Sequence, residues 1–207
     1  MNLLTAIRKR RAVRDYTQEP VSAVALRELI AAASWAPSAM NDQPCHFTVV
    51  TDAALLDEIS ARSKKWMLKG ISAMPRPGHF RDLLSDPEFH IFYHAPVLIV
   101  LSALGDRQWS AEDCALAAQN LMLAAVDQDL GTCWIGFAQG WLNTDEGHDM
   151  LGLPRSSRVI APIIVGHPKT VPPDVSRKTP LITWIGNIAP SIDDNLAPSA
   201  HRTLSHP

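Results

Sequence analysis

Two prolines bracket the stretch Ala36-Pro37-Ser38-Ala39-Met40-Asn41-Asp42-Gln43-Pro44, which lies between an apolar helical run and a strand-like run, Phe47-Thr48-Val49-Val50. Proline fixes its own φ and restricts the residue before it, so this backbone is restrained. Ser38, Asn41 and Gln43 offer side-chain donors and acceptors within six residues. Such a stretch suits the edge of a planar ligand rich in nitrogen and oxygen. Taken alone, it fits an ordinary helix-to-strand loop at least as well.

The chain has 207 residues, enough for one domain with a substantial core. Hydrophobic residues make up 46 % and charged residues 19 %, which indicates a globular protein and not a disordered one. The net charge of −2 argues against a general nucleic-acid or anionic-membrane binder, although a local basic patch remains possible. We predict a single domain over residues 1–190, followed by a C-terminal arm or disordered tail over residues 191–207.

The three cysteines, Cys45, Cys114 and Cys133, lie far apart and are odd in number. They form neither a CxxC pair nor a zinc spacing, which favours a reducing compartment. We expect Cys114 to be a small buried hydrophobe without an activating partner. The first charges, from Arg8 on, follow only a few apolar residues, which is not the order of a signal peptide. No uncharged apolar run reaches membrane-spanning length. A cytoplasmic protein is the expectation.

Five cations stand among the seven residues 8–14, directly after apolar positions spaced like one helical face. Cations near a helix C-terminus are favoured by the helix dipole, but this cluster is denser than a helix end requires. Guanidinium groups can hold a phosphate bidentately or follow a nucleic-acid backbone. Because the chain has neither a basic net charge nor an aromatic-interleaved basic patch, one bound anion is the better functional interpretation. A solvated basic face remains an equal alternative.

Helical spacing predicts one helix capped by Ser22 and ended by Pro37, and another capped by Asp52 and ended by Gly70. A third helix, capped by Ser110, is rich in small residues, which suits a central or dimer-facing helix. Apolar runs predict strands over residues 46–50, 95–101 and 159–165, the second of them buried on both faces. Pro162 within the last run indicates an edge strand or a bulge.

The periodicity of the apolar residues is lost between about residues 70 and 95. Three prolines and a glycine interrupt any regular element there, among scattered aromatic residues: Pro75, Pro77, Gly78 and Pro87. We predict an irregular lid region here, because long irregular loops in compact domains are often binding loops. His79, His90 and His94 do not share a metal-site spacing on one element, so no metal is predicted.

Glycines flank the apolar segment Gly131-Thr132-Cys133-Trp134-Ile135-Gly136, where a backbone can approach a ligand closely. The segment lacks the GxGxxG spacing, so a dinucleotide-binding fold is not predicted.

Three separated segments together resemble the nitroreductase-like family of FMN-dependent oxidoreductases. They are Arg10-Arg11-Ala12-Val13-Arg14, then Ala36-Pro37-Ser38-Ala39 with Asn41, Gln43 and Pro44, and finally Gly131 to Gly136. The resemblance runs from about Ile7 to Trp184. It implies an α+β fold, with a mainly antiparallel central sheet packed between helices. It also implies an intertwined homodimer with two FMN molecules at its interface, each contacted by both subunits.

The same resemblance implies a cofactor site. Arg10 and Arg14 would hold the FMN phosphate and the polar edge of the flavin, while Arg11 and Ala12 would flank the ribityl chain. Pro37, Ser38 and Ala39 would pack on the flavin of the other subunit, whereas Asn41 and Gln43 would contact the ring from their own side. Cys133, Trp134, Ile135 and Gly136 would run beside the ring, with a backbone N–H of Ile135 or Gly136 facing N5. Arg177, with Lys178 as second choice, would complete the phosphate site.

The implied activity is a ping-pong reaction that passes hydride from NAD(P)H through FMN to an electron-poor acceptor of the nitroaromatic or quinone type. The protein would supply position and electrostatics, with no catalytic side chain. Ala12 stands where many relatives have Ser or Thr, and Ile135 where one branch has an acidic residue. Alternatives are a specialised flavin reaction, such as reductive dehalogenation or dehydrogenation, and a flavin-binding sensor or carrier without turnover. A nucleic-acid-binding domain is the less favoured alternative.

Overall fold

The computed structural model describes residues 1–73, 77–105, 107–170, 172–183 and 185. The chain divides into two units, Met1–Pro172 and Pro173–Pro207. Every helix and strand named below belongs to the first unit, and the described part of the second has no regular secondary structure. The predicted domain end at residue 190 and the predicted tail over 191–207 lie outside the described residues and stay predictions.

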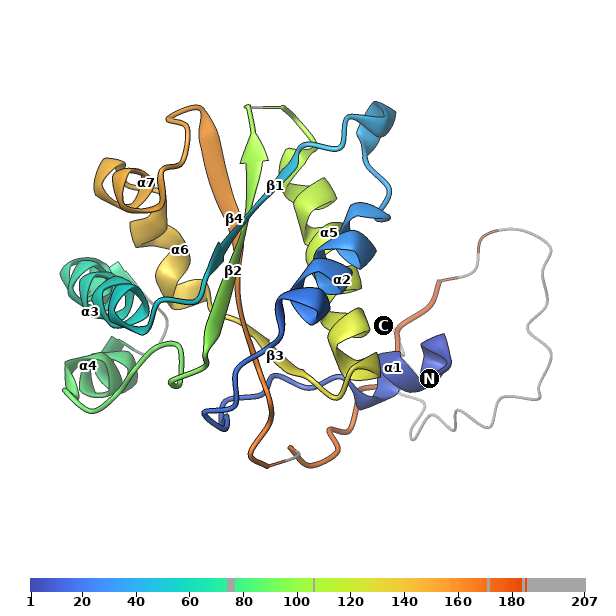
Figure 1. Ribbon diagram of the computed structural model, residues 1–207, viewed down its shortest axis with the longest axis horizontal. Coiled ribbons are helices and arrows are strands. Elements are labelled where there is room, and N and C mark those ends of the chain that lie inside the picture. The colour runs from blue at the N-terminus through green and yellow to red at the C-terminus, as the bar shows by residue number, and fades with distance from the viewer. Residues whose placement is uncertain (74–76, 106, 171, 184, 186–207) are drawn as a thin grey trace, which may run out of the picture. The chain divides into compact units, whose positions relative to one another are not determined.

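A four-stranded antiparallel sheet in the order β1-β2-β4-β3 forms the centre of the first unit (Figure 1). Its strands are β1 Cys45–Val50, β2 Val97–Leu104, β3 Gly131–Trp134 and β4 Ser157–Gly166. Side chains alternate along β2, with Ile99 in one hydrophobic core and Val100 in the other. The predicted strand at 95–101 is therefore buried on both faces, and the predicted α+β fold with an antiparallel sheet is confirmed.

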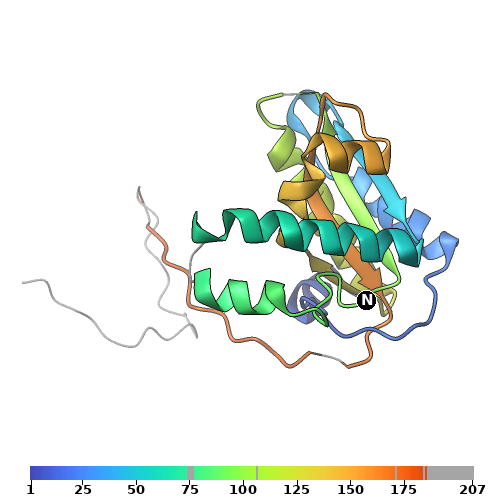
Figure 2. The same cartoon turned by 90° about the vertical axis from the view of Figure 1, so that its left-hand side faces the viewer.

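Helices cover both faces of this sheet, as Figures 1 and 2 show. On one face lie α2 Ala23–Ser34 and α5 Ser110–Asp127, with α1 Leu3–Lys9 packed against α5. On the other face lie α3 Ala53–Gly70, α4 Pro77–Ser85, α6 Gly136–Leu142 and α7 Asp145–Leu151. Two short 3-10 turns complete the unit, η1 Ala39–Asn41 and η2 Ile71–Ala73. Among the described helices, none is long and apolar enough to cross a membrane.

Two of the predicted helix caps are present. The Ser22 hydroxyl accepts a hydrogen bond from the Ala25 N–H at 3.1 Å, and the Asp52 carboxylate accepts one from the Leu55 N–H at 3.0 Å. These contacts satisfy donors that the first helical turn leaves without intrahelical acceptors. Ser110, by contrast, is the first residue of α5 and does not cap it, because Trp109 occupies the cap position.

The predicted irregular region contains a helix. Pro77 is the first residue of α4, where a missing N–H costs nothing, so this proline begins a helix instead of breaking one. Phe80 of α4 packs edge-on against Phe137 of α6, with ring centroids 5.8 Å apart. Among the described residues of this region, irregular backbone is confined to residues 86–96. Aromatic packing therefore holds α4 against the domain.

Pro162 does not mark an edge strand, because β4 lies between β2 and β3. The alternative prediction was a bulge, and the structure has one next to Pro162. Leu101 of β2 pairs with Ala161 and Ser102 pairs with Val159, so Ile160 has no partner in this ladder. The bulge shifts the register of β4 within two residues of Pro162.

Candidate functional site

The basic segment after α1 lies alongside β3. Ala12 forms a parallel bridge to Thr132, and the Val13 N–H donates to the Thr132 carbonyl at 3.0 Å. Gly131 permits this approach, since a Cβ there would lie 2.8 Å from the Cβ of Val13. Two segments that are more than a hundred residues apart in the sequence are thus brought together as adjacent strands.

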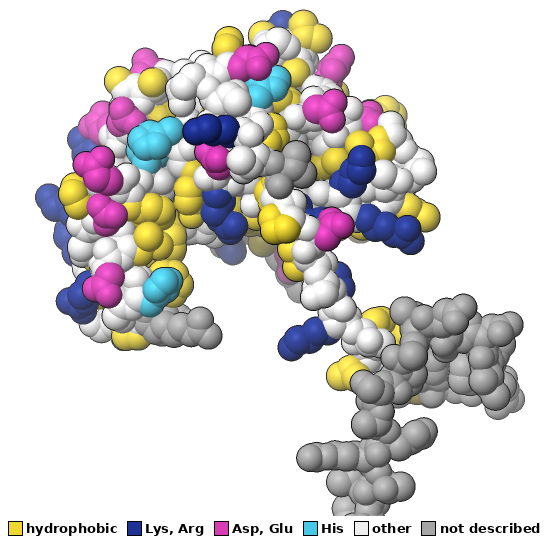
Figure 3. Space-filling model, turned by 90° about the horizontal axis from the view of Figure 1, so that it is seen from below, with side chains coloured by type: hydrophobic (Ala, Val, Ile, Leu, Met, Phe, Trp, Pro, Cys, Tyr) yellow, Lys and Arg dark blue, Asp and Glu magenta, His cyan; other side chains and the backbone are white. Residues whose placement is uncertain are grey.

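A pocket of about 360 Å³ opens where these two segments meet α3, α6 and the turn before β2. This volume lies within the usual range for small-molecule sites. The pocket is lined by Arg14, Met67, Tyr93, Cys133, Trp134, Ile135, Gly136 and Phe137. On the face shown in Figure 3, Lys and Arg side chains (dark blue) adjoin hydrophobic ones (yellow), the same combination as in this lining. Five of these residues, Arg14 and Cys133 to Gly136, were predicted as site residues.

Positive charge dominates the electrostatics of the pocket. The Arg14 guanidinium lies over the ring of Tyr93, 5.9 Å from its centroid. Burial raises the pKa of the Cys133 thiol, and the charges of Arg14 and Arg10 partly oppose that rise. Burial likewise raises the pKa of Tyr93, again opposed by Arg14. Arg10 and Arg14 are thus close enough to act on the pocket and to favour an anionic ligand there.

The backbone amides of Ile135 and Gly136 differ at the pocket. The Ile135 N–H donates to the Pro162 carbonyl at 2.8 Å, so it cannot also serve a ligand. Gly136, the first residue of α6, comes next, and its N–H has no acceptor among the described residues. Of the two amides that the sequence predicted for this role, the structure therefore leaves Gly136.

The Arg11 side chain turns back onto α1. Its guanidinium donates to the carbonyls of Arg8 and Arg10 at 2.5 and 2.8 Å. These contacts satisfy carbonyls that the end of α1 leaves without intrahelical donors. The side chain of Arg11 therefore has a helix-capping role, and the place of its backbone beside the ribityl chain stays a prediction. Ala12, which is exposed, contributes its backbone to the bridge with β3.

The proline-bracketed loop does not reach this pocket in the same chain. It leads into Cys45 of β1, which pairs with Ala103 near the start of β4, whereas Trp134 of β3 pairs with Ile163. By strand geometry the two places are roughly 20 Å apart. Figures 1 and 2 show η1 and β3 toward opposite ends of the sheet. The predicted residues of the loop, Pro37, Ser38, Ala39, Asn41 and Gln43, therefore form a separate group.

Hydrogen bonds hold this loop together as one unit. The Gln43 N–H donates to the Ser38 hydroxyl at 3.0 Å, and the Gln43 side-chain amide donates to the Asn41 side-chain oxygen at 3.2 Å. The Ala39 N–H donates to the Asp113 carboxylate of α5 at 3.0 Å. Ser38, Asn41 and Gln43 are therefore held together as one group, and their assignment to particular flavin molecules stays a prediction.

The loop also has an unusual backbone. Met40, Asn41 and Gln43 have φ values of 54°, 58° and 46°, in the left-handed region that residues other than glycine seldom adopt. The Met40 side chain is 94 % exposed, so the first unit itself offers no packing that explains this conformation. Backbone strain of this kind is often stored at ligand clamps and interfaces.

Three residues of the pocket lining were not predicted, namely Met67, Tyr93 and Phe137. Tyr93 lies in the region predicted as a lid, and its φ of 51° directs the chain sharply before β2. Met67 and Phe137 belong to helices whose apolar spacing looks like ordinary core. The pairing of α3 with α6 that brings them together leaves no local signal in the sequence.

Arg177 and Lys178 belong to the second unit, whose placement relative to the pocket is not determined. Their assignment to a phosphate site stays a prediction.

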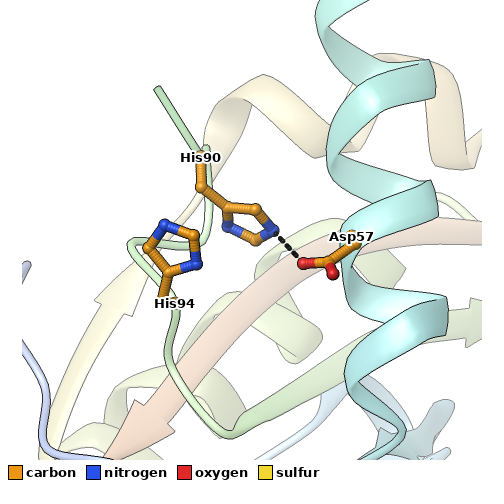
Figure 4. Close-up of side chains that lie close together, drawn as sticks. All are labelled: Asp57, His90 and His94. Atoms are coloured by element: carbon orange, nitrogen blue, oxygen red, sulfur yellow. Dashed lines mark ion pairs between the residues drawn. The ribbon is translucent and has the colours of Figure 1, made fainter. Parts of the chain in front are cut away.

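Asp57, His90 and His94 place ligand-type atoms within 4.8 Å of one another (Figure 4). His90 Nδ1 accepts a hydrogen bond from the Phe92 N–H at 3.2 Å, so neutral His90 carries its proton on Nε2. That nitrogen lies 3.2 Å from the Asp57 carboxylate. Metal binding at Nε2 would require the proton on Nδ1, against the Phe92 amide. We therefore interpret the cluster as a His–Asp pair that joins α3 to the turn carrying Tyr93.

The Nitroreductase family model matches residues 7–167 of this chain. An Archaeoglobus fulgidus protein provisionally named NADH dehydrogenase/NAD(P)H nitroreductase is 30% identical over 167 residues, 80% of this chain and 85% of that protein. The FMN reductase [NAD(P)H] of Bacillus subtilis is 27% identical over 169 residues, 80% of this chain and 66% of that protein.

Comparison with solved structures agrees with the family match. A Bacteroides fragilis nitroreductase with bound FMN matches with a TM-score of 0.76 and 28% identity, over 90% of this chain and all of that one (100%). Iodotyrosine deiodinase bound to FMN and 3-iodo-L-tyrosine has a TM-score of 0.72 at 22% identity, over 89% of this chain and 100% of that one, a likeness of fold alone.

Proposed function

The chain belongs to the nitroreductase family, and we propose that it acts there as an FMN-dependent NAD(P)H oxidoreductase with an electron-poor acceptor. One observation carries the proposal: Arg14 lines one pocket beside Cys133 together with Gly136, whose N–H has no acceptor in the described part of the chain. Nitroreductases with bound FMN that share the fold at 26–28% identity support the choice of cofactor. Relatives named NAD(P)H nitroreductase and FMN reductase support the choice of reductant.

The residues of the pocket fit FMN. Its phosphate needs fixed cations, and Arg10 and Arg14 both act electrostatically at the pocket. Its flat ring needs an apolar wall, which the segment Cys133–Ile135 and Phe137 provide. Its ring nitrogens need a donor, and the Gly136 N–H is available for that role. We assign the backbone of Arg11 and Ala12 to the ribityl chain and Arg177, with Lys178 second, to the phosphate.

When bound, FMN supplies a two-electron carrier that takes hydride from NAD(P)H and passes it to a second substrate. The protein's own contribution is to hold and orient the reactants. A backbone N–H such as that of Gly136 cannot titrate, so it keeps its donor role at every pH. Because one pocket would serve donor and acceptor in turn, a ping-pong order follows, with acceptors of the nitroaromatic or quinone type.

We assign the loop residues Pro37–Ala39, Asn41 and Gln43 to the pocket of a second copy. The loop lies roughly 20 Å from its own pocket, and three of its residues have strained backbone. The apolar face of α1 is also exposed, by 65 % at Leu3 and 64 % at Leu4. Exposed apolar groups on one helix favour burial against a partner. A homodimer would cover α1 and bring each loop to the other copy's cofactor.

The visible absorption spectrum of the purified full-length protein tests the cofactor. We expect a flavin spectrum, either as isolated or after incubation with FMN, which NADH or NADPH bleaches and a nitroaromatic or quinone restores. A protein that stays colourless after incubation with FMN contradicts the proposal. Tight FMN binding without reduction by either nucleotide would favour a sensor or carrier instead.

A further inference from the structure

We propose that Cys45 and Cys114 form a peroxide-sensitive site at which the chain is reversibly cross-linked by a disulfide. Their Sγ atoms lie 3.1 Å apart in an S–H···S hydrogen bond, although the residues are 69 positions apart in the sequence. A disulfide bond is about 2.05 Å long, so the sulfur atoms need to approach by about 1 Å. The inference does not depend on the proposed flavin chemistry, and it rests on the exposure that Cys45 has in the single chain.

The two thiols come from elements that are otherwise well fixed. Cys45 is the first residue of β1, and Cys114 lies in α5. Both pack in a small hydrophobic cluster with Ala103 and Ile160, and Cys114 has no exposed surface. Because strand and helix hold the two side chains against each other, the contact does not depend on a mobile loop.

Only one of the two thiols can be reached from solvent. Cys45 is partly exposed and lines a pocket of about 120 Å³ together with Ser38, Gln43 and Phe47. This volume is large enough for a molecule the size of hydrogen peroxide. The geometry therefore gives the two sulfur atoms different roles. Cys45 is the thiol that reacts with the oxidant, and Cys114 is the buried thiol that then forms the disulfide with it.

The more exposed thiol, that of Cys45, is also the more acidic of the two. The hydrogen bond with Cys114 lowers the pKa of Cys45, because the Cys114 S–H donates to the Cys45 sulfur once that sulfur is a thiolate. The pKa of Cys114 rises, because that hydrogen bond favours its protonated form and burial adds to the effect. A thiolate is the form of cysteine that attacks a peroxide.

The reaction consumes one hydroperoxide. The Cys45 thiolate attacks one peroxide oxygen, the O–O bond breaks, and the departing oxygen leaves as water after taking up a proton, which gives a sulfenic acid. The Cys114 sulfur then attacks the Cys45 sulfur, the S–OH bond breaks, and a second water leaves with the Cys114 proton. Two thiols and one hydrogen peroxide thus give one disulfide and two waters. A dithiol reductant reverses the oxidation.

The third cysteine provides an internal comparison. Cys133 is buried in β3, and its thiol donates to the Trp134 carbonyl at 3.8 Å. Burial raises the pKa of this thiol. With no thiol beside it, Cys133 has no partner for a disulfide in the folded chain, so it stays reduced while the pair reacts.

The cross-link would fix the end of the proline-bracketed loop. Pro44 precedes Cys45, and Asp113, which precedes Cys114, already accepts a hydrogen bond from the Ala39 N–H. A disulfide would add a covalent bond at the other end of the same loop and join β1 to α5 more firmly.

Mass spectrometry tests the proposal on the reduced full-length chain. Hydrogen peroxide is added in slight excess, the remaining thiols are alkylated in denaturant, and the intact and digested protein are weighed. We expect two of the three cysteines to escape alkylation, a mass lower by two hydrogen atoms before alkylation, and a cross-linked peptide joining Cys45 to Cys114. Treatment with dithiothreitol should return all thiols.

Two comparisons make the result specific. In the Cys114→Ala variant the sulfenic acid on Cys45 has no resolving thiol, so dimedone should label Cys45. The same oxidation of wild-type chain in urea should yield other pairs involving Cys133, which shows that the fold selects the partners even if a variant misfolds. Three alkylated cysteines after oxidation, a cross-link through Cys133 in the folded chain, or a disulfide between chains would each overturn the proposal.

Discussion

The guanidinium carbon of Arg14 lies 5.9 Å from the centroid of the Tyr93 ring, and both residues line the candidate cofactor pocket. Arg14 is held by the bridge between its own segment and β3, and Tyr93 by the turn before β2. The contact therefore joins two walls of the pocket that the sequence places 79 residues apart. Arg14 is therefore the cation whose removal should weaken ligand binding in this pocket most directly.

Replacing Arg14 by Ala should weaken FMN binding, because a charge-assisted contact is lost. Such contacts contribute about 1.5–3 kcal/mol, which is roughly a tenfold to hundredfold rise in Kd. Fluorescence titration with FMN measures it. The FMN affinity of Arg14→Lys should fall between those of wild type and Arg14→Ala, since Lys keeps the positive charge but lacks the planar guanidinium that binds a phosphate through two N–H groups. Arg27→Ala, an exposed arginine on α2, serves as control, and equal affinity of Arg14→Ala and this control would exclude Arg14 from the site.

Gly136→Pro should change the electronic properties of the bound flavin. Gly136 is the first residue of α6, a position where proline fits a helix, so the substitution chiefly removes the N–H. We expect a shifted flavin reduction potential and slower reduction by NAD(P)H. Gly136→Ala keeps the N–H, and its Cβ has nothing within 4 Å. If the potentials of the two variants coincide, the Gly136 amide does not contact the flavin ring.

Gly131→Ala should destabilise the fold, because its Cβ would lie 2.8 Å from Val13 Cβ. Forcing extra atoms into such a contact costs about 1–3 kcal/mol, which chemical denaturation with urea can measure. The same substitution in a Val13→Gly background should cost clearly less, since all three close side-chain atoms of Val13 are gone. Strictly additive losses would show that the approach of this segment to β3 is not limited by Gly131.

Stability should fall as the pH drops below about 6.5, the ordinary pKa of histidine. Burial lowers the pKa of His90, the neighbouring His94 and Lys64 lower it further, and Asp57 partly opposes them. A depressed histidine pKa means that the unfolded chain takes up a proton before the folded chain does, so acid favours unfolding. Urea midpoints between pH 7.5 and 5.5 should therefore shift less in His90→Gln than in His79→Gln, which alters an exposed histidine. Parallel shifts in the two variants would rule out His90 as the source.

Leu4→Lys should favour the monomer and lower FMN occupancy together. The Leu4 side chain is 64 % exposed on α1, and a charge there opposes burial against a second copy. Light scattering coupled to gel filtration reports the mass, and absorbance reports the flavin. Val49→Lys, a partly exposed apolar residue on β1, is the matched control. A wild-type monomer with full flavin occupancy would refute the shared site.

Much of the architecture follows from local sequence signals. The uninterrupted apolar run around Val100 predicts a strand buried on both faces, because both sides of a central strand must be covered. Ser22 and Asp52 predict helix starts, because their oxygens satisfy free amides of the first turn. Such signals involve residues that are neighbours in the chain, so they can be recognised without knowledge of the fold. The same holds for the glycine-flanked segment that ends at Gly136.

The tertiary structure decided what depends on contacts between distant segments. It placed Arg14 beside Cys133 through the bridge to β3, and the sequence marks that pairing only by the small size of Gly131. It removed Ile135 from the candidate donors, because the pairing of β3 with β4 uses its N–H. It also set Cys45 against Cys114, which the spacing of the cysteines could not reveal. Local propensity fixes the elements, whereas register and packing fix which side chains meet.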